Sequence, residues 1–442
     1  MFAPRRRFVC RTDRRRFRAD LLHATGRESD GGTRRKSTKR DPSPGARLVS
    51  ENRALQVRRL PSCGAVPPES LRRAGERSLV HNGTQSSPGA TAMPSTARAA
   101  RWTAERTIEV TDKAVRDPAP DEVRVAVGSA GICGSDLHFY RGEFPATPGI
   151  TPGHEFGGTV EAVGADVRHV REGDLVGIEP LLRCGLCPFC LSGDYHVCND
   201  RGLVGQGVDG GMSESATLPG NTVFPAPSGL DAEGVALAEP LACSVHGFEK
   251  VKLRGHETVF IVGAGSIGLT GILAARACGA QAIVLARHPH QQEAARRLGA
   301  VEVIGDDDAG KERMAELARI HAVDVAVETV GGTADTLITA QRVVRPKGRV
   351  VLLGIFTGTR TSIDPLHLAL NEVEVVGAVT YAASDGHADY AVALDVVADH
   401  ADAARSLVTH RFALDDAGQA FDTAVDKSTR SIKVHIQPGT HG

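Results

Sequence analysis

The second half of the chain alternates short apolar runs with amphipathic runs, and this alternation constrains the fold more than any other feature. The apolar runs have the length and the Val, Ile and Leu content of buried strands, and helical spacing follows them. They are TVFIVGAG, AIVLA, VEVIG, DVAVETV and GRVVLLGIF. Strands that alternate with helices form βαβ units, in which the strands are parallel. The sequence therefore predicts an α/β fold with a doubly wound parallel sheet over residues 241–400.

A glycine-rich turn follows the first of these strands. Gly263, Gly265 and Gly268 have the spacing G-x-G-x-x-G, and helical sequence begins directly after the turn. The first glycine permits a tight turn, the second lets the backbone approach a pyrophosphate, and the third allows close helix–strand packing. This context predicts a Rossmann domain that binds a dinucleotide. A plain glycine-rich loop is the alternative.

The end of the second strand favours NADP(H) over NAD(H). Ala286 occupies the position where an NAD site normally has an acidic residue for the ribose 2′-hydroxyl, and Arg287 and His288 follow it. Without a carboxylate there is no repulsion against a 2′-phosphate, and a guanidinium binds phosphate through charge-assisted hydrogen bonds. The alternative is that Arg287 is a solvated charge at a strand end.

The rest of the chain has three other patterns. Residues 93–240 contain short apolar runs split by Gly, Pro and Asp, which are typical of antiparallel strands. Residues 401–442 break the strand–helix alternation, and we expect them to return to the first domain. Residues 1–92 carry 21 Lys and Arg against 8 Asp and Glu, whereas the remainder carries 31 against 45.

The basic segment 1–92 has no sustained apolar pattern, so we expect it to be disordered. A nucleic-acid-binding arm and a transit peptide are alternatives. We favour a physiological start at Met93, just before the organised sequence begins. The chain has no run of about eighteen apolar residues and no apolar core of a signal peptide near its start, which predicts a soluble protein.

Four cysteines fall within fifteen residues, with the spacing C-x2-C-x2-C-x7-C. They are Cys184, Cys187, Cys190 and Cys198. Four thiolates complete the tetrahedral shell of Zn²⁺ and leave no position for water, so such a site is structural. An iron–sulfur or redox role and a nucleic-acid zinc ribbon are the alternatives. With only nine cysteines in 442 residues, the sequence favours a reducing, cytoplasmic setting.

A second set of possible ligands is scattered outside this cluster. Taken singly, each has an ordinary structural explanation, such as a buried thiol or a carboxylate at a helix start. Together, upstream of a dinucleotide fold, they indicate an open metal site. They are Cys133, Ser135, Asp136 and His138 in GICGSDLHFY, His154 and Glu155 in TPGHEFGG, and Glu239 in LAEPLAC.

The motifs CGSDLH, GHE, the four-cysteine lobe, EPL and VGAGSIG resemble those of the zinc-dependent medium-chain dehydrogenases. The resemblance runs from about Arg101 to the C-terminus and is strongest to the sorbitol (polyol) dehydrogenase branch, near butanediol and threonine dehydrogenases. It implies a GroES-like, mainly antiparallel β catalytic domain beside the Rossmann domain. It also implies two Zn²⁺ ions per subunit and a homodimer or homotetramer.

The resemblance further implies which residues hold the catalytic zinc. Cys133, His154 and Glu155 surround it, and Glu239 binds it directly or through water. Cys243, four residues after Glu239, is not expected to be a ligand. A mixed set of sulfur, nitrogen and oxygen ligands leaves a position open for an alcohol oxygen.

Three further residues have roles by the same resemblance. Ser135 contacts the substrate oxygen and His138 carries the proton onward to solvent. Asp136 orients His154 through its second ring nitrogen. The sequence thus predicts a zinc-dependent, NADP(H)-linked oxidoreductase for an alcohol or polyol, favouring a secondary alcohol and its ketone. A catalytically silent NADP(H)-binding redox sensor and a zinc-ribbon nucleic-acid binder are alternatives; neither membrane nor nucleic acid is the expected partner.

Overall fold

The computed structural model describes residues 96–439, except positions 146, 359 and 384–385. The predictions for residues 1–92 therefore lie outside the described residues. All described residues belong to one unit of the chain. Two large sheets organise them, one with six strands and one with seven.

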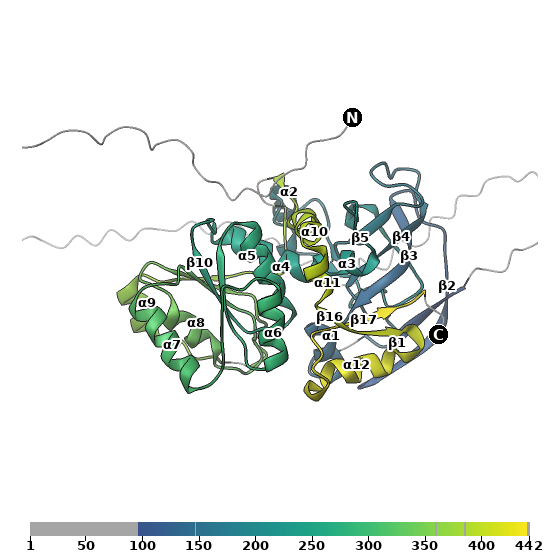
Figure 1. Cartoon of the computed structure of the whole chain (residues 1–442). Helices are drawn as coiled ribbons and strands as arrows, with labels where there is room; N and C mark the ends of the chain where they lie inside the picture. Colours follow the sequence, from purple (N-terminus) through teal and green to yellow (C-terminus); the bar gives the residue numbers. More distant parts are fainter. Residues whose placement is uncertain (1–95, 146, 359, 384–385, 440–442) are drawn as a thin grey trace, which may run out of the picture. The chain divides into compact units, whose positions relative to one another are not determined.

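The six-stranded sheet contains the alternating second half of the chain (Figure 1, green). All of its neighbouring strands are parallel, in the order β12-β11-β10-β13-β14-β15. Because the order reverses at β10, the crossovers on its two sides place helices on opposite faces. The strands are β10 (Thr258–Val262), β11 (Gln281–Leu285), β12 (Glu302–Ile304), β13 (Val325–Glu328), β14 (Arg349–Leu352) and β15 (Glu374–Gly377).

Alternate side chains of β10 show that both faces of this sheet are covered. Val259 and Ile261 belong to one buried cluster, whereas Phe260 and Val262 belong to another. A strand buried on both faces requires the continuous apolar sequence seen here. The helices of this part are α4 (Ala238–Lys250), α5 (Ser266–Ala277), α6 (Pro289–Arg297), α7 (Asp308–Arg319), α8 (Thr336–Val343), α9 (Pro365–Asn371), α10 (Asp389–Asp399) and α11 (Ala401–Arg405).

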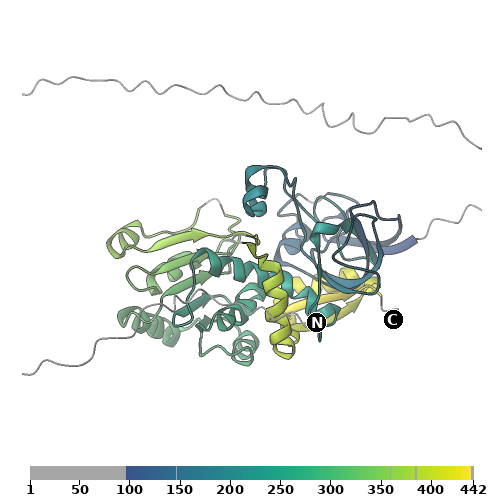
Figure 2. The same ribbon diagram turned by 90° about the horizontal axis from the view of Figure 1, so that it is seen from above.

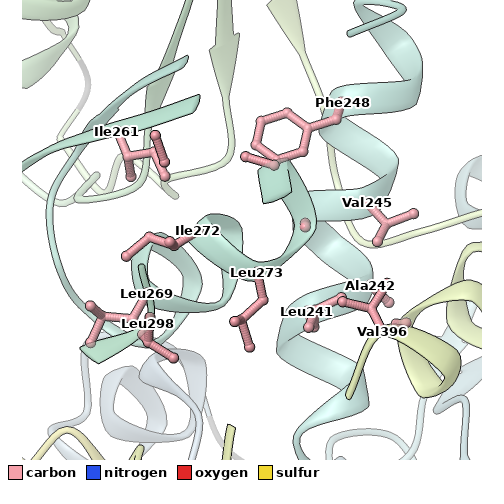
Figure 3. Packing of buried hydrophobic residues seen from close by; sticks show 14 of the residues in the cluster. Leu241, Ala242, Val245, Phe248, Ile261, Leu269, Ile272, Leu273, Leu298 and Val396 are labelled. Atoms are coloured by element: carbon pink, nitrogen blue, oxygen red, sulfur yellow. The ribbon is translucent and has the colours of Figure 1, made fainter. Parts of the chain in front are cut away.

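Helices α4 and α5 pack against each other in the first of these clusters. Leu241 and Phe248 of α4 share it with Leu269 and Leu273 of α5 (Figure 3). Each fully buried side chain of this kind contributes about 2 kcal/mol relative to an exposed one. This packing fixes the first turn of α4, which carries Glu239.

The seven-stranded sheet is mainly antiparallel. Its path is β16-β17-β3-β4-β5-β9, and β8 pairs with β3. The C-terminal strand β17 pairs with β3, and β16 pairs with β17, so the end of the chain joins this sheet (Figure 2, yellow). The strands are β3 (Glu122–Gly131), β4 (Glu155–Val163), β5 (Leu175–Ile178), β8 (Ser215–Pro219), β9 (Val223–Pro225), β16 (Val408–Ala413) and β17 (Lys433–Gln437).

Smaller elements complete the described chain. Two strand pairs stand outside the large sheets: β1 (Thr96–Ala104) with β2 (Thr107–Ala114), and β6 (Leu181–Leu182) with β7 (Gly202–Leu203). The remaining helices are α1 (Gly134–Tyr140), α2 (Pro188–Ser192), α3 (Ala232–Ala236) and α12 (Ala417–Val425). The combination of a mainly antiparallel sheet and a doubly wound parallel sheet confirms the predicted fold class. Among the described helices, none is long and apolar enough to cross a membrane.

Candidate active site and metal centres

Three possible metal ligands meet where β3 ends and β4 begins. Cys133 caps the start of α1 just after β3, and Glu155 is the first residue of β4, directly after His154. In the antiparallel pairing of β3 with β4, Gly131 lies opposite Glu155. One ligand atom from each of the three side chains lies within 4.8 Å of the others. The register of two strands therefore assembles the cluster.

The buried Asp136 contacts both segments that carry these ligands. Its Oδ2 accepts a hydrogen bond from the backbone N–H of Cys133 at 2.9 Å, and its Oδ1 lies 3.4 Å from Nδ1 of His154. The other ring nitrogen of His154, Nε2, lies 3.4 Å from Oγ of Ser135. A carboxylate beside one ring nitrogen orients the ring and leaves the other nitrogen free for a metal.

The charges around His154 favour a cation at this place. Burial alone would lower the pKa of His154, but Asp136 and Cys133 outweigh it and hold the pKa well above its usual value. Both oxygens of Glu155 are buried without a hydrogen bond, although Nζ of Lys433 contacts Oε2. Sulfur, nitrogen and oxygen donors meet here, with His154 and Glu155 buried and Cys133 half-buried, and a donor set that attracts a proton so strongly fits Zn²⁺.

Glu239 lies near this cluster but outside the three-residue set. It is buried in the first turn of α4, and its Oε1 accepts a hydrogen bond from the hydroxyl of Tyr381 at 3.0 Å. Burial raises the pKa of Glu239 to about 7; the charge of His154 opposes this rise, and that of Glu155 adds to it. Burial also raises the thiol pKa of Cys243 well above its usual value. A thiol that keeps its proton is a poor zinc ligand.

The two residues predicted to carry the substrate proton lie on α1. Ser135 faces His154, as described above, and Nδ1 of His138 contacts Oε2 of Glu143. Arg141 donates to the same carboxylate, through Nε to Oε1 at 2.5 Å. Hydrogen bonds from Arg141 and His138 lower the pKa of Glu143 to about 2. Glu143 is therefore a permanent negative partner that orients the ring of His138, and the sequence analysis missed it.

The four clustered cysteines come together in a second, separate set. Four of their Sγ···Sγ distances lie between 3.5 and 3.9 Å. A tetrahedron with Zn–S bonds of about 2.3 Å has edges of about 3.8 Å, whereas a disulfide is about 2.05 Å long. Backbone N–H groups point at the sulfurs, from Cys187 to Sγ of Cys184 at 3.4 Å and from Cys184 to Sγ of Cys198 at 3.5 Å. This geometry fits one Zn²⁺ ion with a complete shell.

The glycine-rich turn leaves an open space at the start of α5. Gly263 has a φ of +102°, and a Cβ there would lie 2.6 Å from Val330. A Cβ at Gly268 would lie 2.0 Å from the carbonyl oxygen of Gly263. At Gly265, by contrast, a Cβ would meet nothing within 4 Å. The first and third glycines thus make the turn, and the second borders the space where a pyrophosphate fits against the helix N-terminus.

The end of β11 presents basic side chains beside this space. Ala286 is fully buried, whereas the side chain of Arg287 is 78% exposed. Nε of Arg287 lies 3.9 Å from a carboxylate oxygen of Asp306, which the sequence analysis did not consider. The rings of His288 and His290 are stacked with centroids 5.7 Å apart. Because exposed ion pairs contribute only about 0–1 kcal/mol, Arg287 is available to another anion.

Comparison with known proteins identifies the family. A model of the alcohol dehydrogenase GroES-like domain matches residues 119–228, and a zinc-binding dehydrogenase model matches residues 266–399. The sorbitol dehydrogenase of Bacillus subtilis is 31% identical over 354 residues, which cover 78% of this chain and 98% of that protein. The chain belongs to the zinc-dependent medium-chain dehydrogenase family, in its sorbitol dehydrogenase-like branch.

Other members of this dehydrogenase family are similar to the chain in sequence and in fold. The L-threonine 3-dehydrogenase of Pyrococcus abyssi is 35% identical over 279 residues, covering 62% of this chain and 79% of that protein. A zinc-binding dehydrogenase of Sinorhizobium meliloti, solved bound to NADP, superposes with a TM-score of 0.71 at 31% identity. That match covers 78% of this chain and all of the other. The protein is therefore an oxidoreductase of the medium-chain dehydrogenase family.

Two more residues at the candidate site were not predicted from the sequence. Tyr381 follows β15 and reaches Glu239, and Lys433 begins β17 and reaches Glu155. Both lie far along the chain from the residues that they contact, and neither belongs to a motif. No local signal in the sequence identifies such pairs. Glu143, by contrast, lies five residues after His138 and could have been found from spacing.

Proposed function

We propose that the protein is a zinc-dependent dehydrogenase that transfers a hydride between an alcohol or polyol and NADP(H). A secondary alcohol and its ketone are the favoured pair, and the relatives named for sorbitol and L-threonine support this class. The observation that carries the proposal is the cluster of Cys133, His154 and Glu155 in the same chain as an open glycine-rich turn. The bound nicotinamide supplies the hydride chemistry itself.

We assign one Zn²⁺ to each set of ligands. Cys133, His154 and Glu155 hold the catalytic ion, with Glu239 acting on it directly or through water. An ion held there supplies a Lewis acid for the substrate oxygen. The ion in the cysteine lobe has only a structural role, because four thiolates leave no room for substrate.

Residues of α1 move the proton in this proposal. Oγ of Ser135 hydrogen-bonds the substrate hydroxyl beside His154; as the hydride leaves, it accepts the substrate proton and at the same time releases its own hydroxyl proton toward His138. The imidazole of His138 passes that proton toward solvent. Glu143 binds Nδ1 of His138, which leaves the second ring nitrogen free to exchange the proton. His154 is positioned by Asp136 and does not need to move during the reaction.

Arg287 selects NADP(H) in this proposal, with Gly263, Gly265 and Gly268 accommodating the pyrophosphate. The S. meliloti relative solved with NADP supports this preference. Arg287→Ala is expected to raise KM for NADP⁺ at least about tenfold and to leave KM for NAD⁺ within about twofold. Arg297→Ala, on the far end of α6, is the matched control. Equal effects of Arg287→Ala on both cofactors would rule out the assignment.

The function is tested by absorbance at 340 nm on zinc-loaded protein. NADP⁺ and NAD⁺ are screened against polyols, vicinal diols, secondary alcohols and primary alcohols, and the matching ketones and aldehydes are run in reverse. Turnover that depends on Cys133 supports the dehydrogenase and identifies its substrate class. Absence of turnover across the panel, with zinc and NADP(H) bound, would favour the silent redox sensor.

A homodimer or homotetramer is also part of the proposal. β15 is an edge strand that pairs only with β14 within the described sheet. Leu366 and Leu370 of the neighbouring α9 are 69% and 75% exposed. An edge strand beside exposed apolar side chains favours pairing with a second copy. Light scattering coupled to size-exclusion chromatography measures the assembly; a monomer at micromolar concentration would contradict it.

The cytoplasmic location of the protein stays a prediction.

A further inference from the structure

Lys433 places a buried ammonium group beside the candidate catalytic metal ligands. Its side chain is 2% exposed, and that of Glu155 is 1% exposed. Nζ of Lys433 contacts Oε2 of Glu155 and donates a hydrogen bond to the carbonyl oxygen of Ile132 at 3.1 Å. A charge buried this deeply requires a partner of opposite charge. The carboxylate of Glu155 is that partner.

A glycine makes room for this ion pair. Gly131 of β3 lies opposite His435 of β17. A Cβ at Gly131 would lie 2.4 Å from Oε2 of Glu155, 3.1 Å from Cε of Lys433 and 3.2 Å from Nε2 of His435. The space above Gly131 is therefore filled by the Glu155 carboxylate and the end of the lysine side chain. Strands β3, β4 and β17 all contribute to it.

Lys433, and not His435, contacts the Glu155 carboxylate. Burial, and then the charge of Lys433, hold the pKa of His435 well below its usual value. Nδ1 of His435 is 2.9 Å from Oγ of Ser129. Burial alone would lower the pKa of Lys433, but Glu155 and Cys133 raise it above its usual value. The ammonium therefore contacts the Glu155 carboxylate, one of the groups that would bind a metal.

Lys433 and a metal ion consequently compete for one carboxylate. We propose that Lys433 is a positioning residue that draws the Glu155 carboxylate toward β17 and so weakens its hold on the catalytic zinc. The inference rests on the proposed function, because it requires zinc at Cys133 and His154. A metal ion that receives less carboxylate charge is a stronger Lewis acid. Lys433 therefore lowers the affinity of the site for zinc and raises the Lewis acidity of the bound ion.

The test is Lys433→Met, which keeps the length of the side chain and removes its charge. Zinc affinity of the catalytic site, measured by competition with a chromophoric chelator, is expected to rise at least about tenfold. In the Co²⁺-substituted protein, the visible bands are expected to shift as the carboxylate moves toward the metal. kcat is expected to fall at least about fivefold, while KM for NADP⁺ changes less than about twofold.

Lys427→Met is the matched control, since Lys427 precedes β17 on the same C-terminal segment and, among the described residues, forms no ion pair with Glu155. It is expected to match the wild type in all three measurements. Gly131→Ala provides a second variant that keeps Lys433 and displaces Oε2 of Glu155 from it. The Co²⁺ bands are expected to shift in the same direction as in Lys433→Met. If Lys433→Met does not fold, Gly131→Ala decides the question.

The possible outcomes separate this inference from the proposed function. Weaker zinc binding in Lys433→Met would show that Lys433 only supports packing, and unchanged Co²⁺ bands would show that it does not position Glu155. Either result overturns the inference. If Cys133→Ser abolishes turnover in the same experiments, the proposed function stands regardless. If Cys133→Ser keeps full turnover, the proposed function fails, and this inference fails with it.

Discussion

The cysteine lobe and the cluster around His154 are both sets of candidate metal ligands, but the chain assembles them differently. The four lobe cysteines lie within fifteen residues, from Cys184 to Cys198. The other cluster joins Cys133 to His154 and Glu155 through the register of β3 and β4. Ligands that are close in sequence are brought together by one loop, whereas ligands joined by strand pairing are brought together only when the whole domain folds.

The two sets also differ in burial and in completeness. In the His154 cluster, His154 and Glu155 are 3% and 1% exposed and Cys133 is half-buried, whereas in the lobe only Cys198 is buried and the other three cysteines are half-buried. Four thiolates satisfy zinc fully, while one sulfur, one nitrogen and one carboxylate do not. Burial with an incomplete shell is the combination that suits catalysis, and a complete shell near the surface suits a structural role. Variants at the two sets should therefore have different effects.

The largest effect is expected from Cys133→Ser. Loss of the thiolate from the buried cluster should lower the rate of hydride transfer at least about 1000-fold, because the Lewis acid is worth several kcal/mol. The melting temperature should change by only a few degrees. Initial rates at 340 nm and zinc content per chain measure the two quantities. A similar rate loss in Cys187→Ser would show that the two sets do not have separate roles.

Cys187→Ser should act on stability instead. Loss of the lobe metal is expected to cost about 4 kcal/mol of unfolding free energy, which lowers the melting temperature by about 5 °C. The rate per folded molecule should stay within about twofold of the wild type. Calorimetry on the variant and on Cys278→Ala, a cysteine outside both sets, provides the comparison. An unchanged melting temperature in Cys187→Ser would show that the metal of the lobe does not stabilise the fold.

Glu239 should make the metal-free protein sensitive to pH. Burial raises its pKa to about 7 in the folded protein, against about 4.3 in an unfolded chain. The unfolded state loses the proton first as pH rises, so unfolding free energy should fall between about pH 4.5 and 7. Glu239→Gln is expected to remove this fall, a difference of up to about 3 kcal/mol. Urea unfolding of the chelator-treated wild type and Glu239→Gln at pH 5 and 8 measures this difference. If both proteins show the same dependence of unfolding free energy on pH, burial does not raise the pKa of Glu239.

A smaller effect is expected from Asp136→Asn. This side chain contacts both segments of the assembled cluster, so its loss should lower zinc affinity there about 10-fold to 100-fold. Zinc in the cysteine lobe should be unaffected, because its sulfurs are oriented by nearby backbone N–H groups. Chelator competition resolves the two ions. Equal loss from both would mean that the variant disturbs the fold as a whole.

The same contrast explains what the sequence could predict. The cysteine spacing, the glycine-rich turn and the apolar runs are local patterns, and the parallel sheet built from those runs is confirmed. The sequence analysis did not name β15, a four-residue edge strand without fully buried side chains, because it lacks a continuous apolar run. The ion pair of Lys433 with Glu155 depends on two strands meeting across the sheet, so spacing could not reveal it.

The most direct test of the account is to remove all metal and then add zinc back in steps. Melting temperature and the rate at 340 nm are followed against equivalents of zinc per chain. Two equivalents should bind, one restoring the melting temperature and the other restoring the rate, with the second step absent in Cys133→Ser. Recovery of both properties with a single equivalent, or turnover without zinc, would contradict the division between a structural and a catalytic site.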